Sequence, residues 1–338
     1  MAITGIHSVT YRVEDLPRCT AFFENWGLTL DRSDAGYATF RLLDGSVVRL
    51  ELATDSQPAS QGVVETVWGV DRPQALDRLA SDLARDRKVK RGDDGVFRFA
   101  SDCGIAMGLA VFDRRPVLNV PDAVNAPSHV RRLNQWRKWR MRAAPKTINH
   151  IVFGVDDYAA SWAFFKQRLG FRLSDHSRGL GVFLRADGAP EHHNLFLQNC
   201  HYHRPSKPAF YHLCFGVEDI DELMAGANYM ERLGHKSALG VGRHRIASAL
   251  FYYIDCPAGG EIEYGADTDY LDDQWIPREW DPRFGYIQWC ANLPPFMAAQ
   301  PDPIVRLLKS EDDADIPDMA PYRLPARPVI STKAEDRG

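Results

Sequence analysis

Two histidines and one glutamate stand where they could bind a metal ion together. A nine-residue phrase occurs twice, as NHIVFGVDD from Asn149 and as YHLCFGVED from Tyr211, so that His150 and His212 occupy the same place in both copies. Farther along, Glu263 lies in the strand-like run GEIEY. Two histidines and one carboxylate on one face of an ion form the ligand set that suits non-haem Fe(II).

A single histidine is most often a packed or surface residue, but here the repeat places two of them in one register. Glu263 lies between Ile262 and Tyr264 and turns to the opposite side of its strand. A carboxylate on an inward face is costly unless it is paired or metal-bound. Nine of the 11 histidines fall between His150 and His244, so we expect histidine chemistry in the second half of the chain.

The phrase belongs to a repeat of four copies, and the repeat predicts the elements that position these side chains. In each copy a β-rich run ends in Val and an acid, and the acid suits the start of a helix. Several short strands with turn residues follow. We therefore expect an α+β fold of four βαβββ modules paired into two domains, each a half-open mixed β-barrel with helices outside. The expected helices cover residues 19–26, 73–83, 158–169 and 220–233.

Changes in composition place the boundaries between these parts. We expect an N-terminal domain at 1–115, a basic connecting segment at 116–146, a C-terminal catalytic domain at 147–290 and a Pro-rich tail at 291–338, which wraps the surface or is partly disordered. In the first domain His7 matches His150 and Glu65 stands in the place of His212, but nothing near residues 106–108 could act as Glu263 does. That domain should be structural, or form a wall of the substrate pocket.

The bulk composition excludes several classes of protein. The 338 residues carry a net charge of −4, which gives no general attraction to nucleic acid or to anionic lipid. No run of 18 apolar residues and no signal-peptide pattern occurs, and the six cysteines lack metal-site spacing, so we expect a cytoplasmic protein without membrane contact or disulfides. The basic run 130–142 predicts a solvated connecting helix whose Trp136 and Trp139 pack on a domain, in preference to a nucleic-acid site.

Three further side chains join the candidate site. His193 ends a His-His pair before a strand, His244 lies in a loop before the next strand, and Tyr253 precedes Glu263 by ten residues, an even spacing that allows both to face one side. Aromatic residues that could line a pocket or pack in the core are Phe183, Phe196, Phe251 and Trp289.

With these motifs the chain resembles the two-domain extradiol catechol dioxygenases of the vicinal oxygen chelate superfamily. The resemblance covers about residues 3–275, is strongest over 147–267, and rests on Asn149-His150, Glu191-His192-His193, Tyr211-His212, Gly242-Arg243-His244 and Glu261 to Gly265. The run Arg245 to Ser248 replaces a polar stretch of the family, and Tyr252 and Cys256 differ from its pattern, so the pocket beside His244 should differ too.

The resemblance implies a function and a role for each residue. His150, His212 and Glu263 would bind Fe(II), in preference to Mn(II), while His193 would act as acid and base, and His244 and Tyr253 would hydrogen-bond the substrate. A catechol and O2 would be the reactants, giving a ring-opened semialdehyde. We expect no nucleic-acid partner and a homo-oligomer, in which the basic segment and the tail are candidate contacts. The alternatives are a glyoxalase-like isomerase or lyase and a sequestering protein on the same fold.

Overall fold

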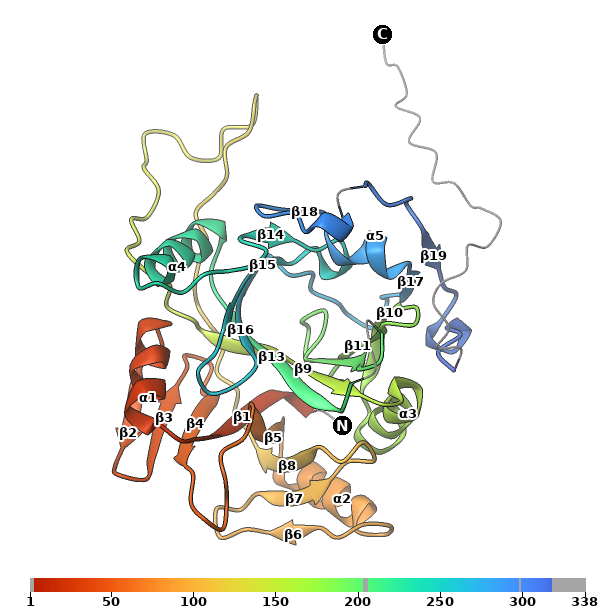
Figure 1. The fold of residues 1–338 in the computed structure, drawn as a ribbon. Coiled ribbons are helices and arrows are strands. Elements are labelled where there is room, and N and C mark those ends of the chain that lie inside the picture. Colours follow the sequence, from red (N-terminus) through yellow and green to blue (C-terminus); the bar gives the residue numbers. More distant parts are fainter. Residues whose placement is uncertain (1–2, 203–205, 298, 318–338) are drawn as a thin grey trace.

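The computed structural model describes residues 3–202, 206–297 and 299–317 and contains two sheets (Figure 1). The first sheet has the order β2-β3-β4-β1-β5-β8-β7-β6. Its strands are β1 (Ile3–Val13), β2 (Leu30–Ser33), β3 (Tyr37–Arg41), β4 (Val47–Leu52), β5 (Val63–Val70), β6 (Lys90–Arg91), β7 (Phe97–Ala100) and β8 (Ala106–Val111), with helices α1 (Leu16–Asn25) and α2 (Pro73–Leu83).

The second sheet has the order β18-β14-β15-β16-β13-β9-β12-β11-β10-β17-β19. Its strands are β9 (Thr147–Val155), β10 (Arg172–Ser177), β11 (Gly181–Arg185), β12 (Leu195–Asn199), β13 (Ala209–Gly216), β14 (Gly242–Arg243), β15 (Leu250–Asp255), β16 (Glu261–Ala266), β17 (Arg278–Trp280), β18 (Trp289–Cys290) and β19 (Val305–Leu307). Its helices are α3 (Tyr158–Leu169), α4 (Ile220–Arg232) and α5 (Pro282–Tyr286), with short 3-10 turns at Ile246–Ser248, Pro295–Met297 and Glu311–Asp313.

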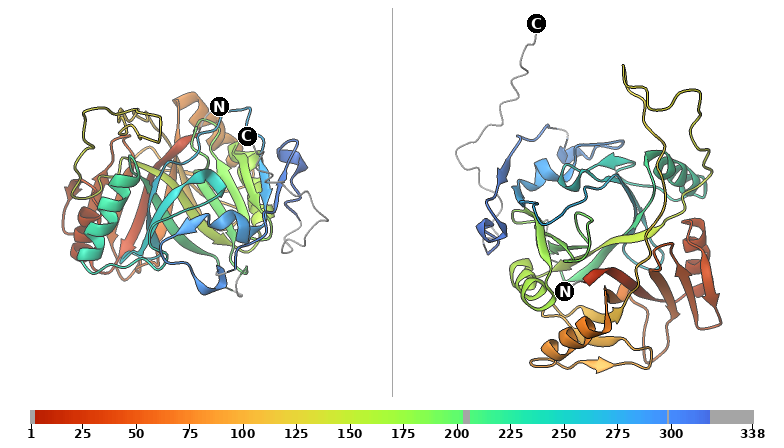
Figure 2. Two further views of the ribbon diagram at one scale, coloured as in Figure 1. Left: turned by 90° about the horizontal axis from the view of Figure 1, so that it is seen from above. Right: turned by 180° about the vertical axis from the view of Figure 1, so that it is seen from behind.

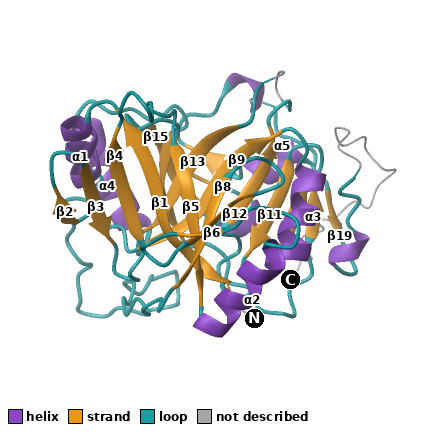
Figure 3. Cartoon of the chain, turned by 90° about the horizontal axis from the view of Figure 1, so that it is seen from below, coloured by secondary structure: helices purple, strands orange, loops and turns teal. Residues whose placement is uncertain are grey.

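Each sheet is built from two βαβββ modules, so the predicted α+β architecture is confirmed. In every module the first strand is parallel to the last, as in β9 with β12 and β13 with β16, and the two opening strands of a sheet pair antiparallel at its centre. Both sheets are strongly curved, and the helices lie outside the strands (Figures 2 and 3). The opening strands β9 and β13 thereby bring the two repeated phrases side by side.

The helices begin where the sequence places the acids. Asp15, Asp157 and Asp219 each accept a backbone N–H of the first turn, while Arg72 caps α2 without a side-chain bond. The predicted ranges of α2 and α3 are correct, whereas α1 begins three residues earlier than Cys19 because Asp15 caps it. Gly170 ends α3 with a φ of 71°, a left-handed conformation that glycine adopts without steric cost.

One hydrophobic core runs through both sheets. The indole of Trp26 stacks on the ring of Tyr264 with centroids 3.5 Å apart, and the Tyr264 hydroxyl donates to the Trp26 carbonyl at 2.7 Å. Tyr11 of β1 packs against Phe210 of β13 at 5.8 Å. These residues are buried, so the N-terminal unit supports the outer side of the second sheet, below it in Figure 1.

The connecting segment differs from its prediction. Residues 130–142 form no helix, and Trp136 and Trp139 are 82% and 89% exposed, so the expected packing of these indoles on a domain is wrong. The side chain of Asn125 accepts the backbone N–H groups of Arg131 and Arg132, and Asp122 accepts that of Lys138. These side-chain bonds take backbone donors that a helix would need.

The segment after residue 290 continues the second sheet. β19 pairs antiparallel with β17, and residues 318–338 lie outside the described part of the chain. Within the described residues no helix is long and apolar enough to cross a membrane. All six cysteines are free thiols in the structure.

Candidate metal centre

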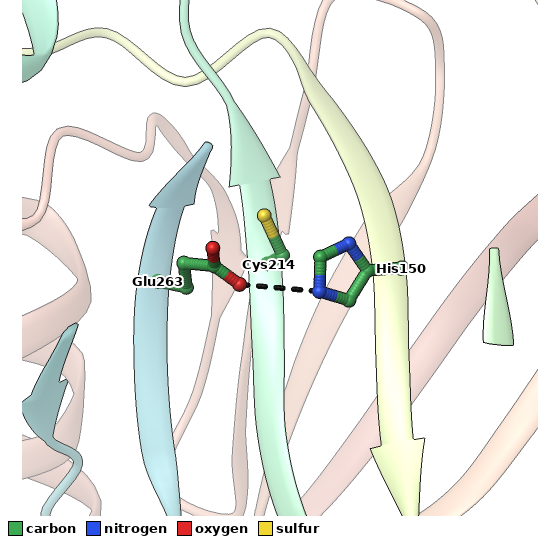
Figure 4. Close-up of side chains that lie close together, drawn as sticks. All are labelled: His150, Cys214 and Glu263. Atoms are coloured by element: carbon green, nitrogen blue, oxygen red, sulfur yellow. Dashed lines mark ion pairs between the residues drawn. The ribbon is translucent and has the colours of Figure 1, made fainter. Parts of the chain in front are cut away.

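The register of three strands brings the proposed ligands together. β13 lies between β9 and β16, and Cys214 is the cross-strand neighbour of both His150 and Glu263. His212 precedes Cys214 by two residues and therefore points to the same face. Figure 4 shows His150 and Glu263 reaching toward each other across β13. The concave face of the sheet thus carries all three side chains.

The three donor atoms form a small triangle. Nε2 of His150 lies 3.1 Å from Oε2 of Glu263, and Nε2 of His212 lies 3.3 Å from the same oxygen. The two Nε2 atoms are 3.2 Å apart. Ligands about 2.2 Å from an ion and about 90° apart would be separated by about 3.1 Å, whereas tetrahedral ligands would be about 3.6 Å apart. The triangle therefore fits three neighbouring positions of an octahedron.

The electrostatics of the triangle also suit a cation. Glu263 is 1% exposed, and its Oε2 lies within hydrogen-bond distance of the Nε2 atoms of His150 and His212. Burial alone would raise the pKa of Glu263, but the charge and hydrogen bonds of His150 and His212 hold it well below its usual value. Burial also lowers the pKa of His150. A buried carboxylate beside two imidazole nitrogens is a site that a divalent ion satisfies.

Cys214 is a fourth potential donor near the triangle. Its sulfur, an imidazole nitrogen of His150 and a carboxylate oxygen of Glu263 all lie within 4.8 Å of one another (Figure 4). Burial raises the pKa of the Cys214 thiol well above its usual value, and the charge of Glu263 adds to the shift. Because the thiolate is the metal-binding form, this shift disfavours Cys214 as a ligand relative to the imidazole of His212.

A chain of hydrogen bonds holds His193 beside the triangle. The ring of His193 lies 4.2 Å from that of His150, and its Nδ1 is 3.0 Å from Nδ1 of His192. Nε2 of His192 is in turn 3.2 Å from Oδ2 of Asp175. Asp175 also accepts from Trp280 Nε1 at 2.9 Å and from the Arg278 backbone at 2.7 Å.

These partners determine which nitrogens carry protons. Asp175 only accepts, so His192 places its proton on Nε2 and turns an acceptor Nδ1 toward His193. His193 then donates from Nδ1 and keeps the lone pair of Nε2 free. Burial and the neighbouring histidines lower the pKa of His193 well below 6.5, so its ring is neutral.

His244 and Tyr253 form a second hydrogen-bonded pair at the cavity. Nδ1 of His244 donates to the Tyr286 carbonyl, which leaves Nε2 to accept from the Tyr253 hydroxyl at 3.0 Å. Burial lowers the pKa of His244 to about 4, and burial followed by the charge of Glu263 raises the pKa of Tyr253 well above 10. Tyr253 is the cross-strand neighbour of Glu263, in agreement with the even spacing.

All six predicted site residues line one cavity of about 1000 Å³. Phe183 and Phe196 stack in its wall with centroids 4.0 Å apart, whereas Phe251 is core beneath His244 and Trp289 is 41% exposed. Apart from the histidines and Glu263, the charged side chains that line it are Glu261 and Arg283, among the described residues. Residues 292–295 and Met297, beyond the predicted catalytic domain, also form part of the wall.

Sequence reasoning missed several residues of this site. Asp175 is 1% exposed and carries the hydrogen-bond chain, but nothing in its spacing marked it. His192, which could equally have been a surface residue, is fully buried. Tyr286 lines the cavity and accepts from His244. Their common property is a contact made across the fold, which no local pattern reveals.

The first sheet carries no equivalent triangle within its described residues. Glu65 pairs with Arg98 at 2.7 Å, and His7 lies at an irregularity of the β1–β5 register, next to Ser8. By strand register the place of Glu263 is taken by Gly108, where an added Cβ would collide with Val96.

Comparison with known proteins relates this site to a family. Residues 147–263 match the model of the Glyoxalase/Bleomycin resistance protein/Dioxygenase superfamily. The chain is 29% identical over 306 residues to metapyrocatechase 2 of Cupriavidus necator, covering 86% of this chain and 91% of that one. Over 146 residues it is 32% identical to an iron-dependent extradiol dioxygenase of Rhodococcus jostii RHA1, covering 39% of this chain and 47% of the relative.

Among solved structures, the Mn(II)-bound glyoxalase from Novosphingobium aromaticivorans has the same fold. It aligns with a TM-score of 0.69 at 23% identity, over 89% of this chain and 95% of that one. At this identity the likeness concerns the fold alone.

Proposed function

We propose that the chain is an Fe(II)-dependent extradiol dioxygenase, on the premise that residues 147–263 match the model of the Glyoxalase/Bleomycin resistance protein/Dioxygenase superfamily. It cleaves the ring of a catechol next to the two hydroxyl groups, and both atoms of O2 enter a ring-opened semialdehyde product. The observation that carries the proposal is the triangle of His150, His212 and Glu263, with side lengths of 3.1 to 3.3 Å.

Fe(II) is the proposed ion, held by His150, His212 and Glu263. Two imidazoles and one carboxylate suit it, and the similar protein of Rhodococcus is named iron-dependent. Mn(II) is the alternative, because the structure from Novosphingobium holds that ion. When bound, such an ion would orient the catechol and O2, act as a Lewis acid and allow electron density to pass between them.

The surrounding side chains handle protons and orientation. His193 offers a neutral Nε2 into the cavity, so it can accept a proton from a catechol hydroxyl and return it later in the reaction. The hydroxyl of Tyr253 donates to Nε2 of His244, whose ring is fixed by the Tyr286 carbonyl, so the Tyr253 oxygen can accept a hydrogen bond from a substrate hydroxyl. The pair can therefore hold an oxygen of the substrate in a defined position, and the apolar wall excludes water.

The cavity favours a bulky apolar catechol. Its volume of about 1000 Å³ lies at the upper end of the range of roughly 300–1,000 Å³ for small-molecule sites. Among the described lining residues, Arg283 is the only Lys or Arg side chain that could pair with a substrate carboxylate. That side chain is 71% exposed. We therefore propose a bicyclic or alkyl-substituted catechol in preference to a carboxylated one.

The proposal also assigns roles to the parts of the chain. Residues 147–290 form the catalytic domain, residues 291–317 complete the wall of its cavity, and residues 1–115 support the sheet from outside. The buried ring pair of Trp26 and Tyr264 is the contact that supports this division.

Oxygen uptake tests the proposed reaction. The purified chain is reconstituted with Fe(II) without oxygen and then mixed with air-saturated catechol, 2,3-dihydroxybiphenyl or 3,4-dihydroxyphenylacetate. We expect one O2 consumed per catechol, with the biphenyl diol giving the highest kcat/KM and the carboxylated catechol the lowest. Iron binding without oxygen uptake for any of the three would favour the isomerase alternative. Unchanged ligand binding by Glu263→Ala would favour sequestration.

A further inference from the structure

The connecting segment carries an apolar surface that the fold leaves uncovered. We call residues 116–142 the arm; it stands out beyond α4 in Figures 1 and 2. Its large apolar side chains are 66% to 89% exposed: Leu118, Val120, Val124, Val130, Leu133, Trp136, Trp139 and Met141. Tryptophan is seldom so exposed in soluble proteins, and here two such indoles lie three residues apart.

The arm has a defined shape although it lacks helix and strand. The Asn125 side chain accepts the backbone N–H groups of Arg131 and Arg132 at 2.8 Å and donates to the Arg132 carbonyl at 2.9 Å. Lys138 donates from its backbone to Asp122 at 2.7 Å and from Nζ to the Val120 carbonyl at 2.6 Å. The two halves of the arm are thus bound by polar groups on the inside, while the apolar groups lie outside.

Three of the six Lys and Arg side chains of the arm form ion pairs at its root. Lys138 and Arg140 pair with Glu218, and Arg137 pairs with Asp219 and Asp221, at the start of α4. These bonds fix the arm to the body and neutralise the charges of Arg137, Lys138 and Arg140. Beyond these pairs, the arm offers a partner its exposed apolar side chains together with Arg131, Arg132 and Arg142.

We propose that the arm is the dimerisation element of this protein and packs on a second copy of the same chain. The two indoles offer about 350 Å², and the six aliphatic and Met side chains about 400 Å² more. The total approaches the ~800 Å² that each partner buries in a stable interface.

A second copy is the occupant that this surface fits best. Obligate homodimer interfaces are the most apolar class, and under twofold symmetry each copy contributes its arm, which doubles the buried area. Beside the root, the helix α4 exposes Ile220, Met224 and Leu233 at 38% to 47%. The inference does not depend on the proposed reaction.

Sedimentation velocity of the full chain, from 0.1 to 50 µM, tests the proposal. We expect the wild type to be a dimer or a higher even oligomer. Trp136→Ser with Trp139→Ser should raise the dissociation constant at least 100-fold, because a central Trp of an interface typically accounts for a factor of about 30 or more. Leu307→Ser is the matched control, since Leu307 is 73% exposed on β19, and it should leave the oligomer intact.

A second measurement keeps the test independent of how the variant folds. Hydrogen exchange of the wild-type chain is followed on dilution, and the backbone of 118–141 should lose protection as the oligomer dissociates, while β9 and β13 keep theirs. A monomeric wild type at 50 µM, or an oligomer unaffected by the double substitution, would overturn the proposal. So would a monomer that binds vesicles of anionic phospholipid through the two indoles, since that assigns the arm to a membrane surface.

Discussion

Replacing Asp175 by Asn should slow the reaction without removing the metal. Oδ2 of Asp175 accepts from His192 and from Trp280, and Oδ1 accepts from the Arg278 backbone. Asn can keep the bond to the backbone, but it then offers an amide nitrogen, a donor, to His192. His192 must either lose the bond or move its proton to Nδ1. In the second case His193 faces a donor, carries its own proton on Nε2 and no longer presents a lone pair to the cavity.

The size of the effect follows from the bond that is lost. A hydrogen bond to a charged group contributes about 1.5–3 kcal/mol, and about 1.36 kcal/mol corresponds to a factor of ten in rate. We therefore expect Asp175→Asn to lower kcat by about 10- to 150-fold. KM should change less than about threefold, because none of the ligands of the proposed iron site is altered.

Steady-state oxygen uptake, normalised to bound iron, measures this effect. His176→Gln is the matched control: His176 follows Asp175 in β10, is fully buried, and bonds Glu279 at 3.1 Å and Tyr158 at 3.3 Å, but does not line the cavity. It should lower stability and leave kcat per iron unchanged. The reasoning is refuted if Asp175→Asn keeps the wild-type kcat, or if both variants lose kcat equally.

Three further predictions concern other parts of the structure. Tyr253→Phe removes the donor to His244 and should lower kcat about 10- to 100-fold with iron content unchanged; a loss of iron would instead make Tyr253 part of the metal site. Burial lowers the pKa of His244 to about 4, against about 6.5 in the unfolded chain, so the unfolded state binds more protons between these values. The free energy of unfolding of the metal-free protein, measured with urea, should thus reach its highest value above pH 6.5 and decrease toward pH 4. This decrease should be less steep in His244→Gln. Tyr264→Phe removes the 2.7 Å bond to the Trp26 carbonyl and should cost about 1–3 kcal/mol of stability, while Tyr37→Phe, which keeps a half-buried ring on β3, should be neutral.

The metal ligands could be proposed from the sequence because the repeat placed them. The local pattern shows two histidines at equivalent positions of the repeat and a carboxylate on a strand-like run. The fold of the modules then brings these positions close together in space. The even spacing of Tyr253 and Glu263 correctly predicted that both side chains lie on one face of the sheet, because side chains alternate between the two faces along a strand.

Other features depend on contacts that no local pattern encodes. Asp175 reaches His192 across two strands of the sheet, so a charged residue in an ordinary strand became part of the site. The run 130–142 has helix-forming residues, yet Asn125 and Asp122, which lie outside that run, take its backbone donors. Tertiary hydrogen bonds thus overrode local propensity.

The most direct test of the metal centre is a count of bound iron. The wild type, His150→Ala, His212→Ala and Glu263→Ala are titrated with Fe(II) without oxygen, and the iron retained after gel filtration is measured, with Cys214→Ala as the control for a buried neighbour. We expect one iron per chain for the wild type and for Cys214→Ala, and none for the other three variants. Stoichiometric iron in any of those three would contradict this expectation.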